Sequence, residues 1–125
     1  MKAVRWMVAG VVAGSVLTAA GMTNLVANGG FESGEKAPAG WSLSQGPGEW
    51  LKEGGADKGA CLMVEGDGAK DNAWASETLD FLPNRVYRLS FNVRGESAGG
   101  STVISGTAFA NVDIGVPGNE WIRHE

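Results

Sequence analysis

The sequence predicts an all-β fold of the sandwich or jelly-roll kind, and three observations support this prediction. Beyond the N-terminal apolar segment, no window keeps apolar residues at helical spacing for long. Short alternating runs recur instead, separated by glycine, asparagine and aspartate. The hydrophobic content of 43% is too high for a disordered protein, and the 20 glycines lack the period of collagen. Short strands joined by glycine turns favour a sandwich over a barrel with a lumen.

The first element, residues 1–20, has the layout of a secretory signal peptide. Lys2 and Arg5 precede an apolar stretch that ends in small residues, which places the cleavage after Ala20 or after Gly21. A membrane anchor is the alternative, but the stretch is shorter than the roughly 20 apolar residues that span a bilayer. We therefore expect a secreted or cell-surface protein that has no contact with a membrane once the signal is removed.

The clearest strand is Val86–Arg94. Its apolar odd-numbered residues form the expected core face, whereas its polar even-numbered residues, Ser90 among them, are expected to face water. Other runs expected as strands are Asn24–Val26, Gly40–Leu43, Cys61–Glu65, Trp74–Phe81, Ser101–Ala110 and Trp121–Arg123. Leu62 and Val64 are expected to point inward, and Asn111–Val116 either extends the preceding run or forms a separate strand.

Several short motifs, taken in order, resemble a known family. They are NLVANGGFE at 24–32, PAGW at 38–41, DKG at 57–59, LPNRVYRLSF at 82–91 and EW at 120–121. This series is similar to the carbohydrate-binding modules with a galactose-binding-like jelly-roll fold, which are often appended to glycoside hydrolases. The resemblance covers residues 24–125. It implies that the last one or two strands are missing. Either the sequence is a fragment of a longer protein, in which a covalently linked downstream domain can follow, or the domain folds incompletely and leaves an unpaired sheet edge; we favour the fragment.

The motifs also have folding roles that do not depend on the family. We expect Gly29 and Gly30 to take positive φ where the chain leaves its first strand. Phe31, Trp41 and Trp121 supply large apolar surfaces, which are usually buried at such positions, so these aromatic residues are expected in the core.

Composition argues against several classes of function. The net charge of −4 disfavours nucleic acid and fits a neutral partner. Cys61 is the only cysteine, which excludes a disulfide framework, and we expect it to be buried. His124 is the only histidine and lies next to the last residue, a poor position for a catalytic triad or a zinc site. No spacing singles out two carboxylates for glycoside hydrolysis. We therefore expect no enzyme activity and no required cofactor.

A neutral sugar is bound by aromatic faces together with a few polar groups. Apart from the tryptophans of the signal and of the expected core, the sequence leaves Trp50 and Trp74. Both follow polar loops from which a ring can face solvent, so both are predicted stacking platforms; a purely structural role is the alternative. The polar face of the clearest strand supplies the predicted hydroxyl partners, with a solvated surface as the alternative: Arg88, Asn92 and Arg94.

The resemblance also implies a structural calcium near the N-terminal strand. Glu32 matches the acidic position of that site, and the backbone around Lys58 would contribute carbonyl oxygens. The acid that the last strand of the family supplies has no counterpart in this sequence. The expected function is non-catalytic binding of a neutral poly- or oligosaccharide. The alternative is a structural or protein-interaction sandwich module of a bacterial surface or exported protein, with no sugar site.

Overall fold

The computed structural model describes residues 4–15, 23–44, 46–66, 72–96, 103–106, 109–113 and 118–125. The strands in these ranges are β1 (Val4–Ser15), β2 (Trp41–Leu43), β3 (Gly48–Leu51), β4 (Cys61–Gly66), β5 (Trp74–Ser76), β6 (Tyr87–Glu96), β7 (Val103–Gly106), β8 (Phe109–Asp113) and β9 (Ile122–His124). The expected all-β class is thereby confirmed. This part of the chain contains no helix that is long and apolar enough to cross a membrane.

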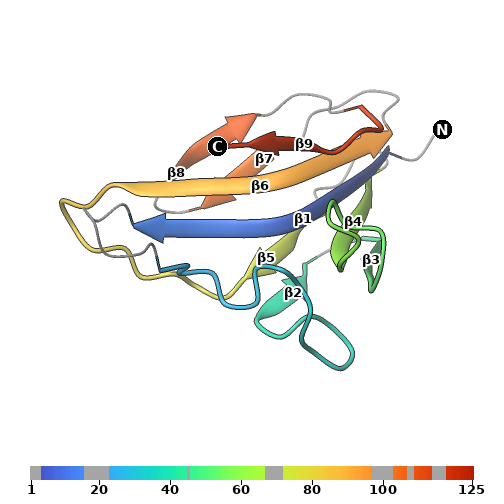
Figure 1. Cartoon of the computed structure of the whole chain (residues 1–125), viewed down its shortest axis with the longest axis horizontal. Coiled ribbons are helices and arrows are strands. Elements are labelled where there is room, and N and C mark those ends of the chain that lie inside the picture. The colour runs from blue at the N-terminus through green and yellow to red at the C-terminus, as the bar shows by residue number, and fades with distance from the viewer. Residues whose placement is uncertain are drawn as a thin grey trace.

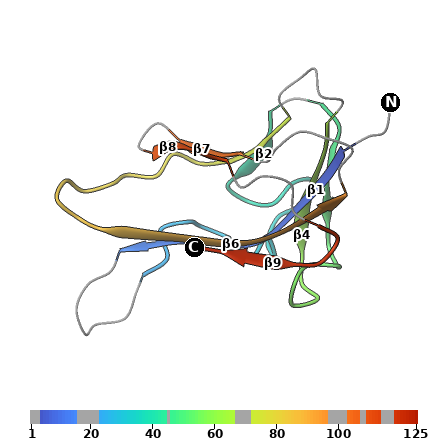
Figure 2. The ribbon, with the colours of Figure 1, turned by 90° about the horizontal axis from the view of Figure 1, so that it is seen from above.

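The strands form one large sheet and two small ones, and every pairing is antiparallel. The large sheet has the order β3-β4-β1-β6-β9, and the small sheets are β2-β5 and β7-β8. In Figure 1, β1 and β6 run side by side along the length of the molecule. Figure 2 shows β2, β7 and β8 on the same side of β6. The small sheets therefore lie beside the large one rather than extending it.

The middle strand of the large sheet is the N-terminal segment that the sequence marks as a signal peptide. Four of the twelve residues of β1 are valine, whose β-branched side chain favours an extended backbone. Val8 lies opposite Leu62 of β4 on one side and opposite Val93 of β6 on the other. This is the arrangement in the whole chain; the removal of residues 1–20 on export stays a prediction.

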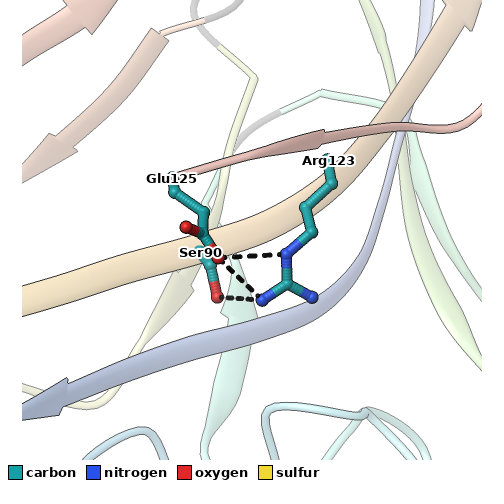
Figure 3. A network of polar contacts seen from close by, with 3 residues as sticks. All are labelled: Ser90, Arg123 and Glu125. Carbon is teal, nitrogen blue, oxygen red and sulfur yellow. Dashed lines mark hydrogen bonds and ion pairs between the residues drawn. The ribbon is translucent and has the colours of Figure 1, made fainter.

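The strand β6 confirms the clearest sequence prediction, with one exception. Phe91 and Val93 are buried on the expected core face. Ser90, which we expected to face water, is also buried, because Arg123 of β9 reaches over it and donates a hydrogen bond of 3.3 Å to its hydroxyl. Figure 3 shows the Arg123 guanidinium facing both Ser90 and Glu125, whose carboxylate it pairs with at 3.0 Å. This exposed ion pair stabilises the fold by at most about 1 kcal/mol.

The strands β2, β4 and β9 confirm three further predictions to within a few residues. In β4, Cys61 and Leu62 are buried as expected, whereas Val64, also expected to point inward, is only partly buried; Met63, on the face of Cys61, is buried as well. Burial also removes the Cys61 thiolate from water, which raises the pKa of the thiol, although the positive charge of Arg94 partly opposes this effect.

Three strand predictions were wrong in extent or in existence. Asn24–Val26 is not a strand, because the Asn24 side chain accepts a hydrogen bond from the Val26 amide and turns the chain. Trp74–Phe81 shortens to β5, which has only the three residues of β2 to pair with. The described part of the run Ser101–Ala110 is divided between the antiparallel strands β7 and β8, which pair from Val103 opposite Asp113 to Gly106 opposite Phe109.

A cluster of buried residues forms the core beside β3 and β4. Phe31, Ala60 and Leu62 form its centre, and the partly buried side chains of three tryptophans pack against it: Trp41, Trp50 and Trp74. The rings of Phe31 and Trp41 meet edge to face, with their centroids 5.1 Å apart. The expected core role of Phe31 and of Trp41 is confirmed.

Candidate functional site

An open hollow of about 520 Å³ lies over β3, at the edge of the large sheet, where the small β2-β5 sheet meets it. It is lined by Glu35, Lys36, Ala37, Leu43, Gly48, Glu49, Trp50, Lys52 and Trp74. The two tryptophans that the sequence nominates as sugar platforms, Trp50 and Trp74, thus share one hollow although they come from different sheets.

Trp50 is held in place by the loop before β2. Its indole Nε1 donates a hydrogen bond of 2.9 Å to the carbonyl oxygen of Phe31. Phe31 is fully buried and has a φ of 61°, a left-handed conformation that is unusual for so large a side chain. The packing that fixes Phe31 in this conformation therefore also fixes the acceptor that orients Trp50.

In the same loop, the expectation that Gly29 and Gly30 take positive φ is wrong. The left-handed residues are Asn28 and Phe31, whereas neither Gly29 nor Gly30 has a positive φ. Asn28 takes this conformation at low cost because its side chain bonds the loop. Its amide nitrogen donates to the carbonyl oxygens of Ser33 and Ala39, and its oxygen accepts from the Ser33 amide.

Trp74 begins β5, where it pairs with Leu43 of β2, another residue that lines the hollow. Its Nε1 donates a hydrogen bond of 3.0 Å to the carbonyl oxygen of Met63 on β4. The ring is half-buried and packs against the core cluster. Both predicted platform tryptophans therefore have a fixed indole N–H and a partly exposed ring.

The charged side chains around the hollow balance one another. Glu35 and Glu49 bring two negative charges, and Lys36 and Lys52 bring two positive ones. Lys52 was not predicted from the sequence: its ammonium nitrogen lies 2.8 Å from the centroid of the Trp50 ring and covers one face of it. The signal was present, since Lys52 follows Trp50 by two residues and alternate residues of an extended chain share a side.

The predicted hydroxyl partners on β6 do not join the tryptophans. Trp50 of β3 lies opposite Leu62 of β4, Leu62 lies opposite Val8 of β1, and Val8 lies opposite Val93 of β6. Residues directly opposite one another share a face of the sheet, so Trp50, Leu62 and Val93 lie on the same face. Side chains of neighbouring residues on a strand point to opposite faces, which puts Asn92 and Arg94 on the other face, and Arg88 follows the same alternation. The guanidinium of Arg94 lies 4.9 Å from the Trp121 ring centroid.

The predicted calcium residues lie close together. Glu32 accepts a hydrogen bond from the Ala60 amide at 2.9 Å, at the end of the loop that contains Lys58. Asp57, which was not predicted as a calcium ligand, also lies near Glu32. Both carboxylates are close to Gly59, since a Cβ atom added there would lie 2.5 Å from a Glu32 oxygen and 3.1 Å from an Asp57 oxygen. Calcium takes six to eight oxygen ligands. No group of three or more histidine, cysteine, aspartate or glutamate side chains able to hold a metal occurs among the described residues.

Comparisons with known proteins give no relative for this chain. No protein-family model matches it. Searches of curated proteins and of solved structures found no significant match either.

Proposed function

We propose that the chain is an exported, non-catalytic module that binds a neutral poly- or oligosaccharide in the hollow lined by Trp50 and Trp74. The observation that carries the proposal is that these two rings line the same hollow. The sequence nominates each of them separately, from its position after a polar loop. We further propose that the sheets belong to a jelly-roll sandwich of the galactose-binding-like kind.

Three properties of the hollow support a neutral sugar as the ligand. Its volume of about 520 Å³ lies within the range of about 300–1,000 Å³ that is usual for small-ligand sites. Its four charged side chains sum to no net charge, so an ionic ligand gains nothing overall. The two indoles are oriented by hydrogen bonds to the backbone before any ligand arrives, which lowers the ordering cost of binding.

Affinity electrophoresis of the folded chain through gels that contain soluble glycans tests the proposal. The panel includes β-glucan and xylan, with a gel lacking glycan and a non-binding protein of similar size as references. Retardation in at least one neutral glycan is the expected result. If no glycan retards a chain that is shown to be folded by its melting transition, the proposal is wrong.

A second candidate function is a protein-interaction or structural module without a sugar site. It is favoured by Lys52, which covers one face of the Trp50 ring and reduces the area available for stacking. Acrylamide quenching of tryptophan emission separates the two candidates. A bound glycan should protect Trp50 and Trp74 from quenching, and Trp50→Phe and Trp74→Phe variants assign the protected emission. Quenching that no glycan alters favours the second candidate.

A further inference from the structure

The large sheet is continuous only through its N-terminal strand. In the described part of the chain, β4 and β6 are not paired with each other, and both pair with β1. The pairing with β4 runs from Val4 opposite Gly66 to Val8 opposite Leu62. The pairing with β6 covers almost the whole of β1, with a register shift between Ala9 and Val12. Residues 4–15 thus occupy a position between two strands rather than at an edge, as Figure 1 shows.

The neighbours of this position are apolar and buried. Leu62 has 3% of its surface exposed and Val93 has none, and both lie opposite Val8. Without β1, each of β4 and β6 would present a row of unpaired backbone N–H and C=O groups, and the buried residues beside the gap would meet water. Removal of β1 therefore leaves a gap between β4 and β6 that an extended strand can fill.

The segment that fills the position has the composition of a removable export signal. Lys2 and Arg5 precede a stretch rich in valine, alanine and glycine. The same residues are thus suited to leave the chain and, in the whole chain, to complete its sheet. The export role and the role in the sheet are compatible when another extended segment replaces residues 4–15 between β4 and β6 after cleavage.

We propose that β4 and β6 form an acceptor site for one extended peptide strand, and that Val4–Ser15 is its occupant in the whole chain. Release of this segment opens the site to an extended peptide of the same character, rich in valine and small residues and antiparallel to both neighbours. The backbone ladders on both sides supply the affinity, and the buried residues beside the gap select the side chains, as in other cases of strand addition. The proposal does not depend on sugar binding at the hollow.

A full-length chain with a specific protease site inserted after Ala20 tests the proposal. The folded chain is cut, and native mass spectrometry reports whether the released peptide of residues 1–20 stays bound. A fluorescent synthetic peptide of the same residues is then added to the cut chain. We expect the cut peptide to remain bound under native conditions and to exchange with the labelled one, while amide hydrogens of β4 and β6 stay protected.

Two peptide variants make the test specific for the strand register. Val8→Pro places proline in the middle of the strand between two partners, where it is not tolerated, and should compete at least about a hundredfold more weakly. Val4→Pro changes the first residue of the strand, where proline is accepted, and should compete within about threefold of the natural peptide.

Loss of the cut peptide with collapse of the sheet supports the proposal if the natural peptide, but not Val8→Pro, restores protection of β4 and β6. The proposal is overturned if the peptide leaves while the melting temperature and the protection of β4 and β6 stay unchanged. It is equally overturned if a collapsed sheet is restored by no peptide, or if the Val8→Pro peptide binds as well as the natural one.

Discussion

Replacing Trp74 with leucine should weaken glycan binding far more than replacing Trp41, although the two substitutions cost similar stability. Trp74 lines the hollow and Trp41 does not. Loss of one aromatic platform is expected to cost about 1–3 kcal/mol of binding, by analogy with stacking on nucleobases, which is roughly 5- to 150-fold in Kd. Trp41→Leu should leave Kd within about twofold, since its ring packs against the core and does not line the hollow.

The stability costs follow from the contacts of each ring. Trp74→Leu keeps some packing but removes the hydrogen bond to the Met63 carbonyl, for a total of about 2 kcal/mol. Trp41→Leu loses the edge-to-face contact with Phe31 and part of its packing, also about 2 kcal/mol. The buried indole nitrogen of Trp41 has no hydrogen-bond partner in the described part of the chain, so no bond is lost there.

Isothermal titration with the glycan that retards the natural chain measures Kd, and denaturant unfolding of both variants measures stability. We expect both variants to remain folded with a similar loss of stability, so that a difference in Kd reports on the ligand contact. An unchanged Kd for Trp74→Leu, or an equal loss of affinity in the two variants, would refute the assignment of Trp74 as a platform.

Three further predictions concern single side chains. Lys52→Ala should strengthen glycan binding up to about fivefold, because the ligand no longer displaces a cation–π contact of about 0.5–1 kcal/mol; weaker binding in the same titration would show that Lys52 contacts the ligand directly. Asn92→Ala should leave Kd within about twofold because Asn92 lies on the face of the sheet opposite to Trp50. A loss of affinity of about tenfold would instead indicate that the ligand contacts β6. Burial raises the pKa of the Cys61 thiol, so the folded state favours the neutral thiol over the thiolate. The stability that the neutral Cys61 thiol contributes is therefore complete below the ordinary thiol pKa of about 8.5, and it is lost as the pH rises through the raised pKa of the folded state. Denaturant unfolding at about pH 7 and about pH 10 should therefore show an alkaline loss that is smaller in Cys61→Ala, and equal losses in both chains would contradict this cause.

The alternation of side chains was sufficient to predict β6, which pairs along most of its length and buries Phe91 and Val93 on the expected face. It also located β4 as a strand, although three successive residues of β4 are buried and its burial does not alternate. The alternation did not predict burial or strand formation where contacts with distant segments of the chain determine them. Ser90 is polar, yet it is buried because Arg123, more than thirty residues later, covers it. The short β3 was missed because Gly48 and Glu49 read as a loop, and only pairing with Val64 and Met63 makes them a strand. Such pairings depend on the register of distant segments, which a local pattern does not contain.

The candidate site was predictable in its aromatic residues and not in its surroundings. Trp50 and Trp74 were identified by elimination among five tryptophans. The sequence suggested freely exposed rings, whereas both are half-buried and bonded through their indole nitrogens. The side of the sheet to which Arg88 and Asn92 belong could not be related to Trp50, because this relation passes through β1, a segment that the sequence marks for removal.

The most specific motif of the sequence contributes to the site without lining it. Asn28 closes the loop by bonding Ser33 and Ala39, and this closure sets the turn that leads into Phe31. The buried ring of Phe31 anchors that turn in the core, and its carbonyl oxygen receives the indole N–H of Trp50. A left-handed residue with a bulky side chain is costly and persists only when its surroundings hold it. The cost is offset because the same conformation aims the carbonyl at a tryptophan of the hollow, so that core packing and orientation of the platform depend on one residue.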